Sequence, residues 1–175
     1  MLDPTPAAPA AQELRVVQAH YHSPLAQELV EEVQGEYVQR YGGRDEAPVD
    51  PEEFVPPHGA FLVALVGNTS VGTAALRRHV PDAGSDEGRD GAVAELKRLY
   101  VRAGHRRRGR ARGILRLTEE RARALGYRRL VLETGTEQPE ALAFYRTRGY
   151  VAIPRFGVYR DEPNSLCFAR ELARP

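Results

Sequence analysis

Arginines and glycines are concentrated in one stretch of the sequence, residues 104–113, which reads GHRRRGRARG. Strand-forming apolar residues precede the stretch, and apolar residues at helical spacing follow it from Ile114 to Leu125. The first N–H groups of a helix have no intrahelical partner, and the helix dipole favours negative charge, so such a turn binds anions. Arginines add bidentate phosphate donors. The stretch therefore predicts a site for a phosphorylated ligand beside the end of a strand.

Two common phosphate-binding patterns do not fit this stretch. A Walker loop needs Gly-Lys-Ser/Thr at the helix start, where this chain has Gly109-Arg110-Ala111. The dinucleotide fingerprint needs G-x-G-x-x-G, and Gly109 and Gly113 are four positions apart. A solvated basic turn is an alternative that the glycine spacing disfavours. A nucleic-acid surface is disfavoured because the run contains no aromatic residue and the net charge is only +1.

The stretch does match R-x-x-G-x-G/A over Arg108 to Gly113, with Ala111 in place of the first glycine. This segment resembles the coenzyme A pyrophosphate loop of the GNAT N-acetyltransferase superfamily. The resemblance extends upstream to residues 95–101 (ELKRLYV) and downstream to residues 141–150 (ALAFYRTRGY). The ordered set spans about residues 60–172 and is far more specific than the loop alone.

The elements around these motifs predict an α/β (α+β) fold. Periodicity indicates the order β-α-β-β-β-α-β-α-β-β, which is typical of a mixed sheet with helices on both faces. The resemblance implies a single GNAT-like domain whose central sheet is splayed at its middle strands. Within residues 92–101 the apolar register slips, and either a β-bulge near Lys97-Arg98 or a strand apolar on both faces would explain it. We favour the bulge because the family has one there.

Composition limits the other classes of protein. The 175 residues fit one domain, expected over residues 12–175, after a disordered Pro/Ala-rich tail at residues 1–11. No apolar run approaches the length of a membrane span, and the N-terminus lacks the pattern of a signal peptide. The single cysteine, Cys167, excludes an internal disulfide. We therefore expect a cytoplasmic monomer or homodimer without nucleic-acid or membrane partners.

The resemblance also implies acetyl-CoA as the co-substrate and a set of residues that bind it. The pyrophosphate would lie on the turn, the pantetheine arm would pair with the edge of the splayed strand, and an N–H of that strand would stabilise the oxyanion. Gln138 stands where the family often has an asparagine that bonds the cofactor arm. The other expected cofactor-binding residues are Leu99, Tyr100, Val101, Arg106, Arg107, Arg108, Gly109, Arg110, Ala111, Arg112 and Gly113.

Acetyl transfer to an amine needs a base and an acid, since a free alkyl ammonium has a pKa of ~10.4 and the thiolate must be protonated as it leaves. Glu95 is the expected base, because it precedes the proposed bulge and many relatives have a glutamate near this position. Its alternative is a strand glutamate paired with Lys97 or Arg98. Tyr145 is the expected acid by its place in the downstream motif, and core packing is its alternative.

The acceptor is expected to be a small amine or an amino acid, bound by the polar loops at residues 44–59 and 153–165. The first loop reads equally well as a surface insertion. No pair of histidines has metal-ligand spacing, so no metal is expected. No G-x-S-x-G is present, which favours direct transfer in a ternary complex. A non-catalytic acyl-CoA sensor is the alternative function. The sequence leaves open the acceptor's identity, the use of longer acyl groups and the oligomeric state.

Overall fold

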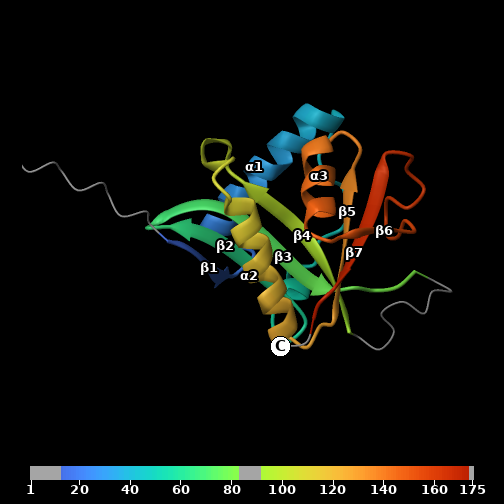
Figure 1. Cartoon of the computed structure of the whole chain (residues 1–175). Helices are drawn as coiled ribbons and strands as arrows, with labels where there is room; N and C mark the ends of the chain where they lie inside the picture. The colour runs from blue at the N-terminus through green and yellow to red at the C-terminus, as the bar shows by residue number, and fades with distance from the viewer. Residues whose placement is uncertain (1–12, 83–91, 174–175) are drawn as a thin grey trace, which may run out of the picture.

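A seven-stranded mixed sheet forms the centre of the molecule (Figure 1). The computed structural model describes residues 13–82 and 92–173, so the tail expected at residues 1–11 lies outside the described residues. The order of strands and α-helices matches the sequence prediction, and two short 3₁₀ turns lie between them. The elements are β1 (Leu14–Ala19), α1 (Pro24–Tyr41), η1 (Pro51–Phe54), β2 (Ala60–Val66), β3 (Thr69–Arg78), β4 (Val93–Val101), η2 (Ala103–His105), α2 (Arg110–Ala124), β5 (Arg129–Gly135), α3 (Pro139–Thr147), β6 (Val151–Ile153) and β7 (Ser165–Glu171).

The strands lie in the order β1-β2-β3-β4-β5-β7-β6. Neighbouring strands are antiparallel except β4 and β5, which are parallel and are joined through α2. A parallel pair needs such a crossover, and the helix returns the chain over one face of the sheet. The mixed sheet predicted from the sequence is confirmed.

Helices cover both faces of the sheet, as predicted. Ala26, Leu29 and Val30 of α1 pack with Phe61 and Val63 on one face, while α2 and α3 share a larger core on the other. Leu25, Leu29, Val33 and Tyr37 follow one another at steps of four in the sequence, a spacing that predicts one apolar face of this helix. That prediction is wrong at Leu25, which is 36% exposed. At 3.6 residues per turn each step of four advances by roughly 40°, so a row of such steps drifts off the buried face.

Strand β4 contains the predicted β-bulge. Thr73 lies opposite Tyr100 and Ala75 opposite Lys97, so two steps along β3 match three along β4. The extra residue is accommodated at Arg98, whose φ of 55° lies in the left-handed region. Beyond the bulge β4 has left its other neighbour, since it pairs with β5 only from Val93 to Glu95. The two strands diverge toward the top of Figure 1, and the predicted splay is confirmed.

Gly109 and Gly113 of the basic turn are explained by two different structural constraints. Gly109 precedes α2 with a φ of 72°, a conformation that favours glycine. A Cβ at Gly113 would lie 2.5 Å from Leu14 Cδ2, so this glycine lets α2 approach β1 closely.

Among the described helices, none combines the length and the apolar character that crossing a bilayer requires.

Candidate active site

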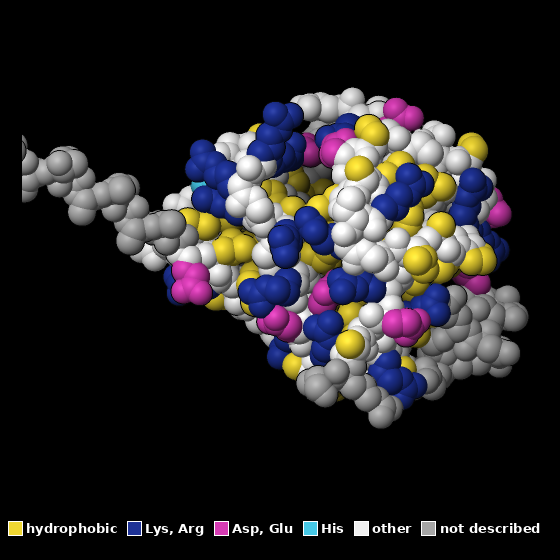
Figure 2. All heavy atoms as spheres, in the orientation of Figure 1, with side chains coloured by type: hydrophobic (Ala, Val, Ile, Leu, Met, Phe, Trp, Pro, Cys, Tyr) yellow, Lys and Arg dark blue, Asp and Glu magenta, His cyan; other side chains and the backbone are white. Residues whose placement is uncertain are grey.

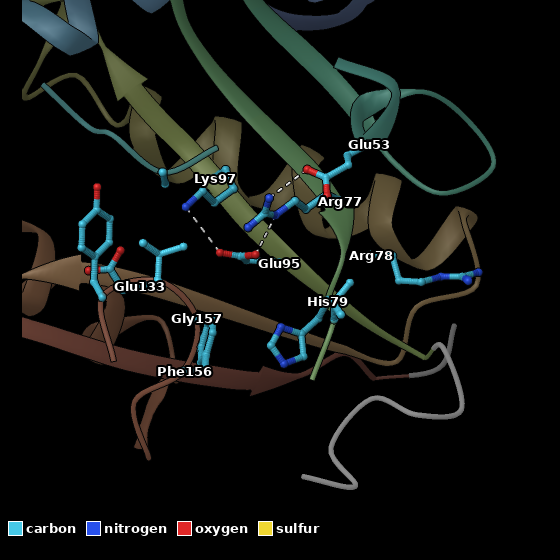
Figure 3. A pocket seen from close by; sticks show the side chains of 13 residues that line it. Glu53, Arg77, Arg78, His79, Glu95, Lys97, Glu133, Phe156 and Gly157 are labelled. Atoms are coloured by element: carbon cyan, nitrogen blue, oxygen red, sulfur yellow. Dashed lines mark hydrogen bonds and ion pairs between the residues drawn. The ribbon is translucent and has the colours of Figure 1, made fainter. Parts of the chain in front are cut away.

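Two adjoining cavities lie where β4 and β5 separate. The larger has a volume of about 360 Å³ and includes Leu99, Gln138 and Tyr145, which the sequence predicted to be site residues, in its wall. The smaller has a volume of about 170 Å³ and includes Glu95 (Figure 3). Three residues line both cavities and mark the passage between them: Lys97, Glu133 and Tyr159.

The predicted phosphate-binding turn, residues 106–113, lies outside the walls of both cavities and leads into α2. The N-terminus of α2 has no side-chain cap, so its first N–H groups face outward for a ligand. The side chains of Arg107, Arg108 and Arg112 are exposed and make no ion pair or hydrogen bond with any residue that the structure describes. Figure 2 shows Lys and Arg side chains gathered around this turn, beside a hollow in the surface. These features fit a pyrophosphate group.

A row of glutamates on α1 forms ion pairs with arginines at the beginning of this turn. Glu28, Glu32 and Glu36 are four residues apart and therefore share one helix face. The Arg102 guanidinium lies 2.5 Å from Glu28 and 2.8 Å from Glu32. Arg106 pairs with Glu36 and donates from Nε to the Val101 carbonyl at 2.8 Å. Arg106 was expected to bind phosphate, but its guanidinium already bonds protein groups. This favours a structural role, in which Arg106 fixes the position of the turn.

The far part of β4 presents an open edge. From Leu96 to Val101 it has no β5 partner, so an extended ligand can lie along that edge. The Tyr100 side chain packs toward α1 and donates to Glu32 at 3.2 Å, and burial raises its pKa to about 12. Any contact of Tyr100 with a ligand in the opening therefore falls to its backbone.

Glu95, the base expected from the sequence, is buried and ion-paired. Its carboxylate lies 2.7 Å from Arg77 Nε and 3.5 Å from Lys97 Nζ (Figure 3). Arg77 also bonds Glu53, at 2.8 Å. The pairing with Lys97 was one sequence alternative, whereas the pairing with Arg77 was not foreseen. Two basic side chains, Arg77 and Lys97, therefore already occupy the Glu95 carboxylate.

Glu133, which lines both cavities, is a candidate site residue that sequence reasoning missed. It lies on β5 across the opening from Lys97, and its Oε1 accepts a hydrogen bond from Ser165 Oγ at 3.2 Å. Burial raises the pKa of its carboxyl above the ordinary value, and the nearby Lys97 ammonium only partly offsets this. The available signal was an acidic residue directly after the apolar run LVL (residues 130–132), near the end of a strand.

Tyr145 and Gln138 lie on the α3 side of the larger cavity. The Tyr145 ring packs against Tyr150 in the core, and burial raises the pKa of its hydroxyl, which is therefore protonated at neutral pH. The Gln138 amide donates to the Tyr41 hydroxyl at 2.8 Å. The same hydroxyl would meet a Cβ at Gly135 at 2.2 Å, so Tyr41 packs against the end of β5 in the wall of this cavity.

Other kinds of catalytic centre find no support among the described residues. No group of three or more His, Cys, Asp or Glu within residues 13–82 and 92–173 is placed to hold a metal ion. Burial raises the pKa of the Cys167 thiol, which disfavours the nucleophilic thiolate.

Comparison with known sequences gives one family. The model of the acetyltransferase (GNAT) family matches residues 26–150. The IAA acetyltransferase of Azospirillum brasilense is 30% identical over 83% of this chain and 89% of its own length. N-acetyltransferase 8F1 of Rattus norvegicus is 36% identical over 57% of this chain, a match that spans 42% of the rat protein.

Solved structures share the fold at low sequence identity. A GNAT-family acetyltransferase from Staphylococcus aureus Mu50 matches with a TM-score of 0.68 and 20% identity, covering 92% of this chain and 100% of its own. A Bacillus subtilis acetyltransferase in complex with CoA matches with a TM-score of 0.61 and 14% identity, covering 92% and 100%. An Elizabethkingia anophelis acetyltransferase with acetyl-CoA bound gives 0.61 and 15%, covering 91% and 98%.

Proposed function

Because the chain belongs to the acetyltransferase (GNAT) family and is an acetyl-CoA-dependent N-acetyltransferase, we propose that it acetylates a small-molecule amine by direct transfer within a ternary complex. The single observation that carries the proposal is the separation of β4 from β5 beyond Glu95, which leaves a free strand edge beside two cavities. A co-substrate anchored at the turn would reach the cavities along the free edge of β4.

Charged side chains and backbone groups would bind different parts of acetyl-CoA. The exposed guanidiniums of Arg107, Arg108 and Arg112, with the uncapped start of α2, would hold the pyrophosphate. The backbone of Leu99 to Val101 would pair with the pantetheine arm and bond the thioester carbonyl. Gln138 would join them after releasing Tyr41. These assignments place the thioester in the larger cavity, near Tyr145.

For the base, Glu95 and Glu133 are the two candidates, and we propose Glu133. A general base at neutral pH works best when its pKa lies near the operating pH, and burial moves that of Glu133 in this direction. Glu95 is held by two cations, Arg77 and Lys97. We propose that it fixes Lys97 in place, which positions the ammonium beside Glu133.

In the transfer step the amine nitrogen attacks the thioester carbon, forming the C–N bond while the C–S bond breaks. The amine proton passes to Glu133, directly or through a water. The departing thiolate takes its proton from the Tyr145 hydroxyl, which burial keeps protonated at neutral pH, and the proton held by Glu133 then returns through water to the Tyr145 phenolate. General acid–base help of this kind is typically worth ~10²–10⁴-fold.

Two observations support a small acceptor: the volumes of the two cavities and the name of a relative. The two cavities, of about 170 and 360 Å³, suit a small molecule beside a thioester. The relative in Azospirillum brasilense carries the name of an acetyltransferase for a small molecule, IAA.

Release of free thiol from acetyl-CoA, measured against a panel of amines and amino acids, tests the proposal. Thiol release that depends on an acceptor and accompanies an N-acetylated product is the expected result. Tight acetyl-CoA binding without acceptor-dependent thiol release across the panel would favour an acyl-CoA sensor instead.

A further inference from the structure

Arg98 is a buried cation without adequate partners. Its side chain is 3% exposed, yet Nε and Nη1 have no hydrogen-bond partner among the described residues. It is also the bulge residue of β4, with a φ of 55° that a side chain adopts at some energetic expense. Ionised guanidiniums are normally buried only with acceptors around them. An acceptor for these N–H groups is therefore expected from outside the described residues, and a bound ligand is one source of it.

The nearest carboxylate does not meet this need. Asp45 Oδ2 lies 4.0 Å from Arg98 Nη2, which is beyond hydrogen-bond distance. The other oxygen of Asp45 is occupied, because it accepts from the Tyr159 hydroxyl at 2.8 Å and from the Ala47 N–H at 3.1 Å. Asp45 thus supplies a countercharge to Arg98 but leaves its donors unsatisfied.

The cavity around Arg98 also contains an acid suited to an amine. Arg98 and Glu133 line the same space of about 360 Å³. The other arginine in its wall, Arg44, is exposed and bonds Glu31 through two contacts of 2.8 and 3.1 Å. Arg98, a buried cation, and Glu133, a carboxylate whose pKa is raised by burial, therefore line the same small cavity.

We propose that the acetyl acceptor is an amino acid, with its carboxylate bound by the Arg98 guanidinium and its amine directed toward Glu133. The planar fork of arginine matches a carboxylate, and charge-assisted hydrogen bonds are stronger than those between neutral groups. Lys97 adds a second positive charge, because it lines the cavity and its one described ion pair, with Glu95, spans 3.5 Å. The proposal rests on the acetyltransferase function proposed above and narrows its acceptor.

The test compares matched acceptors that differ only at the carboxylate. For each common amino acid, kcat/KM is measured beside that of its primary amide and of the amine that lacks the carboxyl group. We expect the best amino acid to exceed its amide and its amine by at least about 100-fold, because a site built to bond a group discriminates strongly against its absence. In Arg98→Met this ratio should fall toward one. Arg98→Lys, which keeps the charge without the fork, should give an intermediate ratio.

Two controls make the outcome specific. Arg116→Met removes an exposed arginine that pairs with Glu120 on α2, and it should leave the ratio unchanged. Calorimetric binding of CoA by Arg98→Met should match the wild type. Loss of CoA affinity with an unchanged ratio would show that Arg98 serves the co-substrate and would overturn the proposal. Arg98→Gln, with melting temperature recorded, replaces the methionine variant if that variant does not fold.

Binding of amino acids to the CoA-loaded protein, measured by calorimetry, separates this inference from the proposed function. Binding that requires Arg98, without any turnover, would support the carboxylate site while the transferase proposal fails. Efficient acetylation of amides or simple amines, equal to that of every amino acid, would overturn the carboxylate site while the transferase proposal stands.

Discussion

Glu95 and Glu133 lie on neighbouring strands, yet their surroundings give the two carboxylates different properties. Glu95 bonds Arg77 at 2.7 Å and is close to Lys97, whereas Glu133 has a single hydrogen bond from Ser165 and a pKa raised by burial. The sequence singled out Glu95 through a family motif. The relative electrostatics of the two residues depend on which strands meet, which no single-sequence pattern contains.

The pair Glu133→Gln and Glu95→Gln tests the assignment of the base. A base acts only after losing its proton, so a raised pKa moves the rising limb of the pH profile above the range of an ordinary carboxylate, ~4.3. Glu133→Gln should lower kcat about 10²–10⁴-fold and remove that limb. Glu95→Gln should keep the limb and lower the melting temperature, since Arg77 loses a partner. If Glu95→Gln alone removes the limb, the assignment must be reversed.

Tyr145→Phe separates the catalytic from the structural reading of Tyr145. The ring packs on Tyr150, whereas no described residue bonds the hydroxyl, so the phenylalanine should preserve the melting temperature and acetyl-CoA affinity. We expect a modest fall in kcat, because a thiol of pKa ~8.5 is only a moderately poor leaving group near neutral pH. Stopped-flow thiol release gives the rate. An unchanged kcat with a much lower melting temperature would identify the hydroxyl as structural.

At the scale of secondary-structure elements, ion pairs connect α1 to the basic turn. The glutamate row of Glu28, Glu32 and Glu36 meets Arg102 and Arg106 and so sets where the turn begins. Periodic spacing of the glutamates was visible in the sequence, but their partners were not, because those lie about seventy positions away.

The double variant Glu32→Gln, Glu36→Gln should weaken CoA binding several-fold while shifting the melting temperature only slightly. Each partly exposed ion pair contributes at most ~1 kcal/mol to folding, but a looser turn must be ordered again on binding. Calorimetry at low and high salt measures both effects. Glu120→Gln, which breaks an exposed pair on α2, is the control. Equal CoA affinity in the double variant and the wild type would show that the glutamate row does not position the turn for CoA binding.

The elements themselves were largely predictable, for identifiable reasons. Period-2 and period-3.6 patterns located the strands and helices. The slip of apolar parity, together with the family resemblance, indicated a bulge near Lys97-Arg98, and the structure has it at Arg98. The inner face of α1 was placed less well, since Leu25 is exposed and Ala26 is buried. Gly113 was predicted to admit pyrophosphate, yet its neighbour is Leu14, a contact that depends on tertiary packing.

Over the whole molecule, two distant loops meet above the cavities. The Tyr159 hydroxyl donates to Asp45 at 2.8 Å and accepts from the Glu46 N–H at 3.1 Å, joining segments more than a hundred residues apart. Phe156 of the second loop packs on His79 at the end of β3. The loops were predicted to form the acceptor pocket, but their mutual contact could not be derived from sequence spacing.

Tyr159→Phe should therefore raise the KM for the acceptor several-fold and leave CoA affinity unchanged. Removing one hydroxyl breaks the link to Asp45, and the freed carboxylate then competes for Arg98. Steady-state kinetics with either substrate varied distinguishes the two effects. A rise in the Kd of CoA without a change in acceptor KM would contradict the placement of these loops at the acceptor side.

The most direct test of direct acetyl transfer is a mass balance on the wild-type protein. Acetyl-CoA is mixed with the best acceptor of the panel, and free thiol, N-acetylated product and the intact mass of the protein are followed together. We expect one product per thiol released, no thiol release without acceptor, and no protein species heavier by an acetyl group at any time. Thiol release without acceptor, together with an acetylated protein that then passes its acetyl group to the acceptor, would contradict direct transfer.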